Sequence, residues 1–180
     1  MNQKFDLEIT NKMVGNWGLS RSLIRGLNKT IKEGYERGSK KAAHKYYEQL
    51  RKNIRDGASR FGYAPLKPKY VKRKMSRTGR SGLFRFYNVY YRSIIMTKSG
   101  DNYLVHIKRG VRNPRTGGKI TISKIAAILE KGTNTIPERP LWKDTFKQIG
   151  GRKYVRKTIE SAIAYQFLKK YNVTLRRHAI

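Results

Sequence analysis

Apolar residues recur at intervals of about four over the first third of the chain, with charged residues between them. The recurring positions are Leu19, Leu23, Leu27, Ile31 and Tyr35, followed by Ala42, Tyr46, Leu50 and Ile54. This spacing predicts an amphipathic helix that runs to about Asp56. Gly34 and Gly38 weaken the pattern, since each costs roughly 1 kcal/mol relative to Ala inside a helix. We therefore expect two helices, or one long helix with a break near these glycines.

The period is lost over residues 57–82, where Gly, Pro and small residues alternate with basic ones. Such punctuation predicts an extended or loop segment. No acid occurs in the second half of this segment, and Tyr70 is interleaved with the cations. The basic residues of this run are Lys67, Lys69, Lys72, Arg73, Lys74, Arg77 and Arg80.

Aromatic and β-branched residues dominate the next segment and predict a β-hairpin. Its strands are expected at residues 91–98 and 103–108, joined by the turn residues 99–101. A second glycine-rich basic loop follows, which contains Arg112 and Arg115. Beyond it, Ser123 is predicted to cap a short helix over residues 124–131, and Gly132 to end that helix.

Two further helices are predicted towards the C-terminus. The first covers residues 141–149, and Gly150-Gly151 separates it from a last amphipathic helix. The length of 180 residues suits one domain with tails. We expect an arm over residues 1–18, a single domain over 19–150, and a helix and tail over 151–180.

Charge is the most extreme property of the chain. Lys and Arg number 42 against 11 Asp and Glu, a formal net charge of +31. A chain of this kind repels itself, so an anionic partner or an assembly is expected to support it. The basic run with Arg112 and Arg115 is a candidate contact for phosphates or for an acidic protein partner, and a solvated, flexible loop is the alternative reading. Because basic residues spread over every segment, backbone contact without base readout is favoured over sequence-specific binding.

No pattern of residues predicts an active site. There is no Cys, the acids are scattered singly, and the three His share no metal-ligand spacing. No glycine-rich loop carries the Lys-Ser/Thr ending of a phosphate-binding loop. We expect no enzyme activity and no cofactor; a metal-dependent nuclease assembled from distant acids stays open as an alternative. No apolar run is long enough to span a bilayer, and the first ten residues are not those of a signal peptide.

Three segments, in order, resemble the tail-completion and neck proteins of tailed bacteriophages, the Mu-type virion morphogenesis family and its relatives. They read YAPLKPKYVKRK (63–74), SGLFRFYNVYYRSI (81–94) and IAAILEKGTNTIPERPLWKDTF (125–146). That family has a helix ending in Glu-aromatic-Gly-Thr, then Ile-Pro-Ala-Arg-Pro-Phe and another helix. Lys131, Glu138 and Leu141-Trp142 depart from that pattern. The residues that fall on positions of the pattern are Glu130, Gly132, Thr133, Ile136, Pro137, Arg139, Pro140 and Leu141, the last of which stands where the family has Phe.

The resemblance implies an α+β fold, with N-terminal helices packed on a small antiparallel β-sheet and extended loops. It does not explain the excess of basic residues in those loops or the C-terminal helix, which the apolar spacing predicts. It also implies a homo-oligomeric ring, often hexameric, between the capsid portal and the tail. Its partners would be portal or head-completion proteins and the tail terminator or tail tube, with genomic double-stranded DNA in the channel. Such a virion protein does no chemistry. A general nucleic-acid-binding protein is the alternative that the charge supports.

The proline-rich turn within the third segment has two readings. As structure, Gly132 ends a helix, the prolines restrict φ, and Arg139 is predicted to form an ion pair with Glu130. As an interface, the stiff turn presents an apolar edge to a neighbouring subunit with little loss of entropy on docking. The predicted interface residues are Ile136, Pro137, Arg139, Pro140, Leu141 and Trp142.

Overall fold

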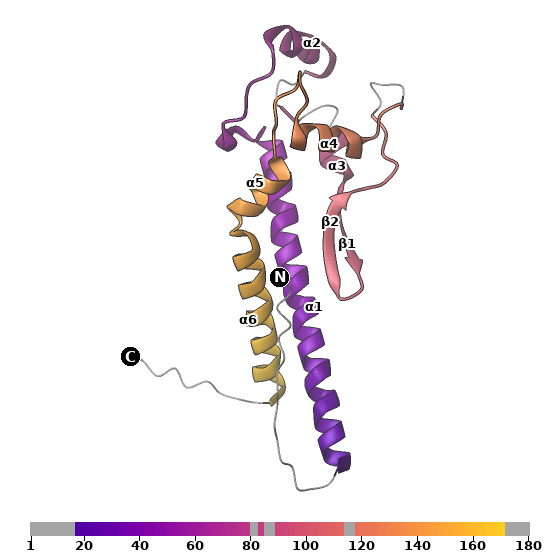
Figure 1. Ribbon diagram of the computed structural model, residues 1–180, viewed down its shortest axis with the longest axis vertical. Helices are drawn as coiled ribbons and strands as arrows, with labels where there is room; N and C mark the ends of the chain where they lie inside the picture. The colour runs from indigo at the N-terminus through magenta and orange to yellow at the C-terminus, as the bar shows by residue number, and fades with distance from the viewer. Residues whose placement is uncertain (1–16, 80–82, 85–88, 114–117, 172–180) are drawn as a thin grey trace, which may run out of the picture.

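The computed structural model describes residues 17–79, 83–84, 89–113 and 118–171 (Figure 1). The fold is α+β, as predicted, and helices dominate it. Apart from residues 17 and 18, where the first helix begins, the predicted N-terminal arm lies outside the described residues. In chain order the elements are α1 (Trp17–Arg55), η1 (Ser59–Phe61), α2 (Pro68–Thr78), α3 (Val89–Ser93), β1 (Ile94–Ser99), β2 (Asn102–Ile107), α4 (Ile122–Lys131), α5 (Leu141–Gln148) and α6 (Gly151–Tyr171).

Helix α1 is continuous, so the predicted break near Gly34 and Gly38 is wrong. Both glycines lie where α6 runs beside α1 along the length of the molecule (Figure 1). A Cβ atom on Gly34 would lie 2.6 Å from the Cα of Ile163, and one on Gly38 would lie 2.6 Å from the Cα of Ile159. The glycines therefore let the two helix backbones meet, and this contact offsets their low helix propensity.

The buried stripe on the first part of α1 is not the predicted one. Leu23 and Ile31 are 47% and 43% exposed, although both belong to the apolar pattern. Helix α6 instead covers small residues four apart, and close helix approach favours such residues over large ones. They are Thr30, Gly34 and Gly38, and the buried stripe then continues to Ala42, which does belong to the predicted pattern. Further along α1 the predicted positions Leu50 and Ile54 are completely buried.

The predicted hairpin is confirmed as the antiparallel pair β1 and β2, whose register runs from Ile94 opposite Ile107 to Ser99 opposite Asn102. Strand β1 begins later than predicted because the preceding residues form the short helix α3. A two-stranded hairpin is marginal by itself. This hairpin packs on α1, on the side away from α6 (Figure 1), and the Tyr103 amide donates to the hydroxyl of Ser39 at 3.1 Å.

Residues 68–78 form a helix, so the prediction of an extended or loop segment is wrong there. Pro68 occupies the first helical position, where its missing N–H costs nothing. Gly79 ends the helix with φ +62° and donates its amide to the Met75 carbonyl at 2.8 Å. Proline at the start and glycine just past the end are a recognised helix signature, which the dense run of basic residues obscured.

The helices on either side of the proline turn follow the prediction closely. Helix α4 is capped by Thr121, two residues before the predicted Ser123, because the Thr121 hydroxyl accepts the Lys124 amide at 3.3 Å. Helix α5 begins at Leu141 as predicted and ends one residue early, at Gln148.

The core lies where the end of α1 meets α3, α4, α5 and the start of β1. From this core the remainder of α1 and most of α6 extend away as a helical pair, which gives the elongated shape in Figure 1. None of the helices in the described ranges combines the length and apolar character needed to cross a membrane. The buried core residues are Leu50, Ile54, Ala58, Phe84, Tyr90, Ile94, Ile122, Ala126 and Leu141.

Candidate functional site

The turn between α4 and α5 begins at Gly132, which ends α4 as predicted. Gly132 has φ +69° and donates its amide to the Ile128 carbonyl at 2.8 Å. A Cβ atom there would lie 2.9 Å from the Glu138 amide nitrogen, so the returning chain also requires glycine. Thr133 and Ile136 exchange backbone hydrogen bonds of 2.8 and 3.2 Å, which close the loop between them.

Glu130 caps the start of α5 from the end of α4. Its carboxylate accepts the amides of Trp142 at 3.2 Å and Lys143 at 3.0 Å. These amides belong to the first turn of α5, where the adjoining residue, Pro140, has no side-chain acceptor. A carboxylate at this end of a helix also interacts favourably with the helix dipole.

Arg139 points to a different part of the chain. Its Nε and Nη2 donate to the Ala64 carbonyl at 3.4 and 3.0 Å, and its amide donates to the Leu129 carbonyl at 2.7 Å. The side chain is 4% exposed, and burial lowers the pKa of its guanidinium. The predicted ion pair with Glu130 is therefore wrong, because each side chain satisfies backbone groups instead. Both residues still brace the turn.

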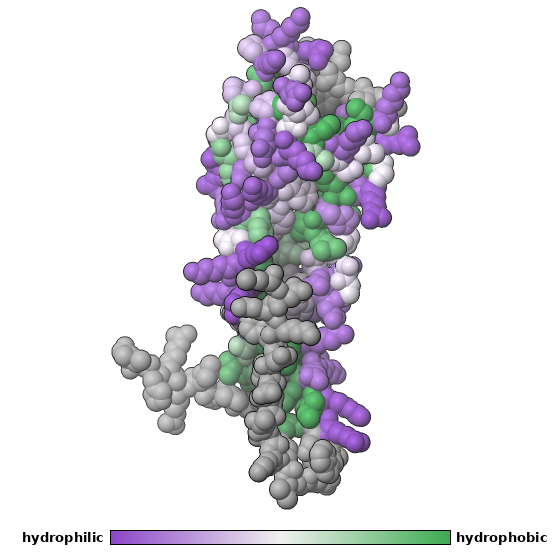
Figure 2. All heavy atoms as spheres, viewed as in Figure 1, coloured by the Kyte–Doolittle hydropathy of each residue, from purple (hydrophilic) through white to green (hydrophobic). Residues whose placement is uncertain are grey.

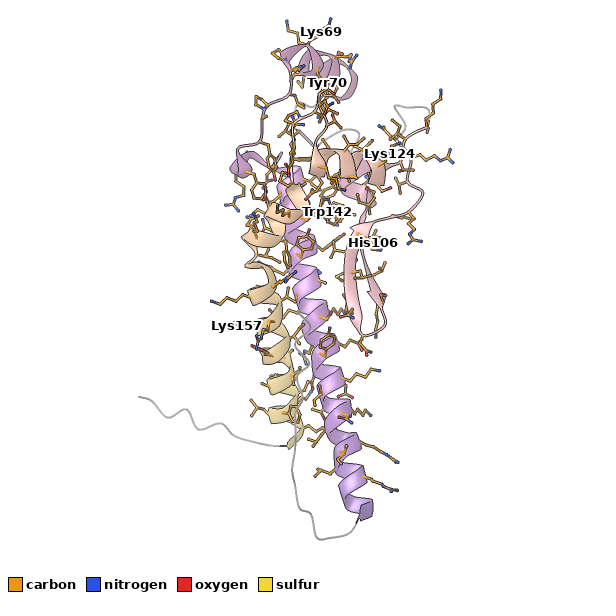
Figure 3. The ribbon with its side chains drawn as sticks, in the orientation of Figure 1. Lys69, Tyr70, His106, Lys124, Trp142 and Lys157 are labelled. Atoms are coloured by element: carbon orange, nitrogen blue, oxygen red, sulfur yellow. The ribbon has the colours of Figure 1, made fainter. Side chains whose placement is uncertain are left out.

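The predicted apolar interface edge is mostly internal. Leu141 is 1% exposed and belongs to the core, and Arg139 is buried as well. Trp142, labelled in Figure 3 at the start of α5, is half-buried against the core, and its indole N–H donates to the Tyr90 hydroxyl at 2.8 Å. Pro140 is half-buried, so only Ile136 and Pro137 of the six predicted residues are exposed. The prediction is wrong for Arg139 and Leu141, because residues after a turn serve a core as readily as an interface, and it stays a prediction for the others.

Contacts join the three segments that carry the family resemblance. The Tyr63 hydroxyl donates to Asp144 at 2.8 Å, next to the contact between Arg139 and Ala64. The ring of Phe84 lies 6.2 Å from that of Tyr63 and 6.1 Å from that of Tyr90. Segments that are separate in sequence thus form one aromatic and hydrogen-bonded unit around the proline turn.

Because α2 is a helix, most cations of the basic run point to solvent, whereas Lys74 points into the protein. Hydrophilic side chains gather over the end of the molecule where α2 lies (Figure 2). Among the predicted contacts outside the run, Arg112 is exposed. The side chain of Arg77, and the whole of Arg80 and Arg115, lie outside the described parts. Four of the predicted phosphate contacts from the run are exposed at the start of α2 or along it: Lys67, Lys69, Lys72 and Arg73.

Lys74 is the exception within the run, because only 2% of it is exposed. It lines a cavity of 560 Å³ beneath α2, whose other walls are largely apolar and come from α4 and the proline turn. Burial lowers the pKa of Lys74 to about 8. The prediction that Lys74 contacts a phosphate is therefore wrong. Lys74 lies one helical turn after Tyr70, so only the helical geometry of residues 68–78 places it on the buried side of α2.

The acids and histidines form no metal site among the residues that the structure describes. His44 lies 3.1 Å from Glu48 on the surface of α1, and the ring of His106 contacts the Thr97 hydroxyl at 2.9 Å. His106 is thus a half-buried hairpin residue whose ring nitrogen lies within hydrogen-bond distance of a hydroxyl on the paired strand.

No family model, no curated protein and no solved structure matches the chain.

Proposed function

We propose that this chain is a structural virion protein, a subunit of the homo-oligomeric ring that joins the capsid portal to the tail of a tailed bacteriophage. The observation that carries the proposal is the joining of the three resembling segments into one unit. Residues that match the family pattern are the ones that build this unit: Glu130 caps α5, Gly132 turns the chain, and Arg139 binds the Ala64 carbonyl.

The surface of the chain is also suited to an assembly. Leu23, Ile24 and Ile31 expose between 43% and 56% of their area along α1, and Ile136 exposes 36% at the proline turn. Burial of such side chains between subunits would stabilise a ring at about 25 cal/mol per Å². In this proposal the protein does no chemistry and assembles beside portal or head-completion proteins, the tail terminator or tail tube, and channel DNA.

Electron microscopy tests the ring, first with purified protein and then with phage particles that carry a labelled copy of the chain. We expect closed rings and a label at the junction of head and tail. Arg139→Ala is expected to reduce incorporation into particles, whereas Lys131→Ala, which alters an exposed residue of the same turn, serves as the matched control. A protein that stays monomeric and never enters particles would contradict the proposal.

A general nucleic-acid-binding protein is the second candidate, favoured by the exposed cations of α2. Lys67, Lys69, Lys72 and Arg73 line one open hollow with Tyr70, and no acid lies among its walls. Binding to random-sequence DNA should weaken steeply between about 50 and 200 mM salt. Binding without ring formation would favour this candidate over the virion role. An absence of binding at the lower salt concentration would eliminate it.

A further inference from the structure

A groove of 640 Å³ follows the seam between α1 and α6, far from α2. Arg37 and Lys41 line it from α1, one helical turn apart. Lys157 lines it from α6, together with the rings of Tyr154 and Tyr165. We call this set the α1–α6 groove. Figure 3 labels Lys157 on α6, which lies across α1 from the hairpin.

Close packing of the two helices brings these cations together. Because the backbones meet at Gly34 and Gly38, side chains that flank the seam on either helix reach a common space. The guanidinium of Arg37 lies 4.9 Å from the centre of the Tyr165 ring, which is a cation–π contact across the groove. Residues more than a hundred positions apart in sequence therefore form one surface.

The groove carries positive charge without a compensating acid. None of its lining residues is Asp or Glu. Of the acids near the groove along the two helices, Glu36 pairs with Lys98 on the hairpin and Glu160 accepts from Arg156 at 2.7 Å, while Glu33, one turn before Arg37, forms no ion pair with it. Among the described residues, no carboxylate lies within ion-pair distance of Arg37, Lys41 or Lys157.

We infer that the α1–α6 groove binds the phosphate backbone of nucleic acid, with Lys41 and Lys157 each contacting a phosphate. Cations interleaved with aromatic rings are the pattern of grooves that bind single-stranded nucleic acid without sequence preference, because the unpaired bases stack on the rings. The groove adds a second contact surface to the cations of α2, at a distance along the molecule, so a strand could be held at two places. The inference does not rest on a role in a virion, because it follows from the groove alone.

The test compares two double substitutions that remove equal charge. Lys41→Gln/Lys157→Gln removes both cations from the groove. Lys124→Gln/Lys131→Gln removes two exposed lysines from α4 (Lys124 is labelled in Figure 3), which lies outside it. Affinity for a random-sequence single-stranded DNA is measured for each full-length protein between about 50 and 200 mM salt. Each lost phosphate contact should reduce the salt slope by about 0.7, so the slope of the groove variant should fall by about 1.4 and that of the control should change little.

A lysine footprint locates the contact independently of affinity. In the wild-type protein, DNA should protect Lys41 and Lys157 from acetylation more than it protects Lys124, as mass spectrometry can measure. Thermal unfolding checks that both variants fold, because exposed substitutions of this kind change stability little.

Equal changes of slope in the two variants, or protection that does not favour the groove lysines, would overturn the inference, as would a wild-type protein that binds no DNA. Poly-glutamate that protects the same lysines equally well would assign the groove to an acidic protein instead. Each of these results leaves the ring proposal standing, since electron microscopy of particles tests the ring. Conversely, a protein that forms no ring leaves the groove inference intact.

Discussion

At the scale of single residues, side chains around the proline turn serve backbone groups. Pro140 offers no side-chain acceptor to the start of α5, and Glu130 supplies one from the preceding helix. Arg139 secures the segment that leads into α2 through the Ala64 carbonyl. Two separate sets of hydrogen bonds therefore hold the turn: Glu130 binds it to the start of α5, and Arg139 binds it to the segment before α2.

Separate sets of hydrogen bonds predict additive effects. Arg139→Ala removes a buried side chain and leaves the Ala64 carbonyl without its charged donor, so it should cost about 2 kcal/mol of unfolding free energy. Glu130→Ala removes a helix cap and should cost about 1 kcal/mol. In urea unfolding, the double variant should lose the sum of the two within about 0.5 kcal/mol. A much smaller loss in the double variant would show that the two side chains depend on each other after all.

Lys74 predicts a pH dependence of stability. Burial lowers the pKa of Lys74 from 10.5 to about 8, so the unfolded chain holds this proton more tightly than the folded one. Below pH 8 the Lys74 amine is protonated in both the folded and the unfolded chain, so the unfolding free energy does not change with pH through this group. As pH rises from about 8 towards 10.5 the folded chain releases the proton first, and the unfolding free energy should rise.

Lys74→Met removes the titrating group and should therefore flatten the rise of the unfolding free energy above pH 8. Urea unfolding between pH 7 and about 9.5 measures this slope, because tyrosine ionisation adds its own dependence at higher pH. Lys72→Met, an exposed change on the same helix, should keep the wild-type slope. The interpretation fails if the two variants show the same pH profile.

At the scale of elements, a glycine destabilises a single helix but can stabilise the contact between two helices. Gly34 and Gly38 lower the propensity of α1, and the same absence of a side chain lets α6 approach. Only the second effect depends on residues more than a hundred positions away. For this reason a pattern read along the chain indicated a break, whereas the structure has a helical pair.

Helix propensity and helix packing predict opposite changes in the unfolding free energy for a Gly→Ala substitution in α1. Propensity alone would make Gly34→Ala and Gly38→Ala stabilising by about 1 kcal/mol each. Because each new Cβ would meet backbone at 2.6 Å, we expect each variant to lose about 1 to 3 kcal/mol in thermal or urea unfolding. Asn28→Ala, at an exposed position of the same helix, is the control and should be neutral or slightly stabilising. Stabilised glycine variants would mean that α1 and α6 do not meet in this way.

At the scale of the whole molecule, the net charge of +31 dominates the electrostatics. The described ion pairs are surface pairs, such as Lys32 with Asp101 at 3.3 Å, and contribute little. Self-repulsion between the remaining cations is therefore the larger effect, and salt screens it over distances of about 10 Å at 0.1 M.

Salt should consequently stabilise this protein. Between low salt and about 0.5 M NaCl we expect a gain on the order of 1 kcal/mol, which raises the melting temperature by a few degrees for a chain of this size. Calorimetry across a NaCl series measures the shift. A melting temperature that falls with salt would show that the surface ion pairs outweigh the repulsion.

Much of the fold could be predicted because the signals are local. The hairpin follows from β-branched and aromatic residues around a Gly-Asp turn, and α5 follows from its apolar spacing after the prolines. The candidate site could be predicted less well. Glu130, Gly132 and Arg139 were recognised as a brace, but their hydrogen-bond partners were not, since Arg139 reaches a carbonyl 75 residues earlier in the chain.

The sequence by itself determined the hairpin, the helices on either side of the proline turn and the excess of positive charge. Each depends on the conformational preference or the charge of residues close together in the chain, so no distant contact was needed to predict it. Only the tertiary structure decided which cations are buried, which apolar residues of the turn join the core, and that α1 stays whole against α6. Those outcomes depend on which distant surfaces meet, because the same lysine or glycine stabilises one packing arrangement and destabilises another.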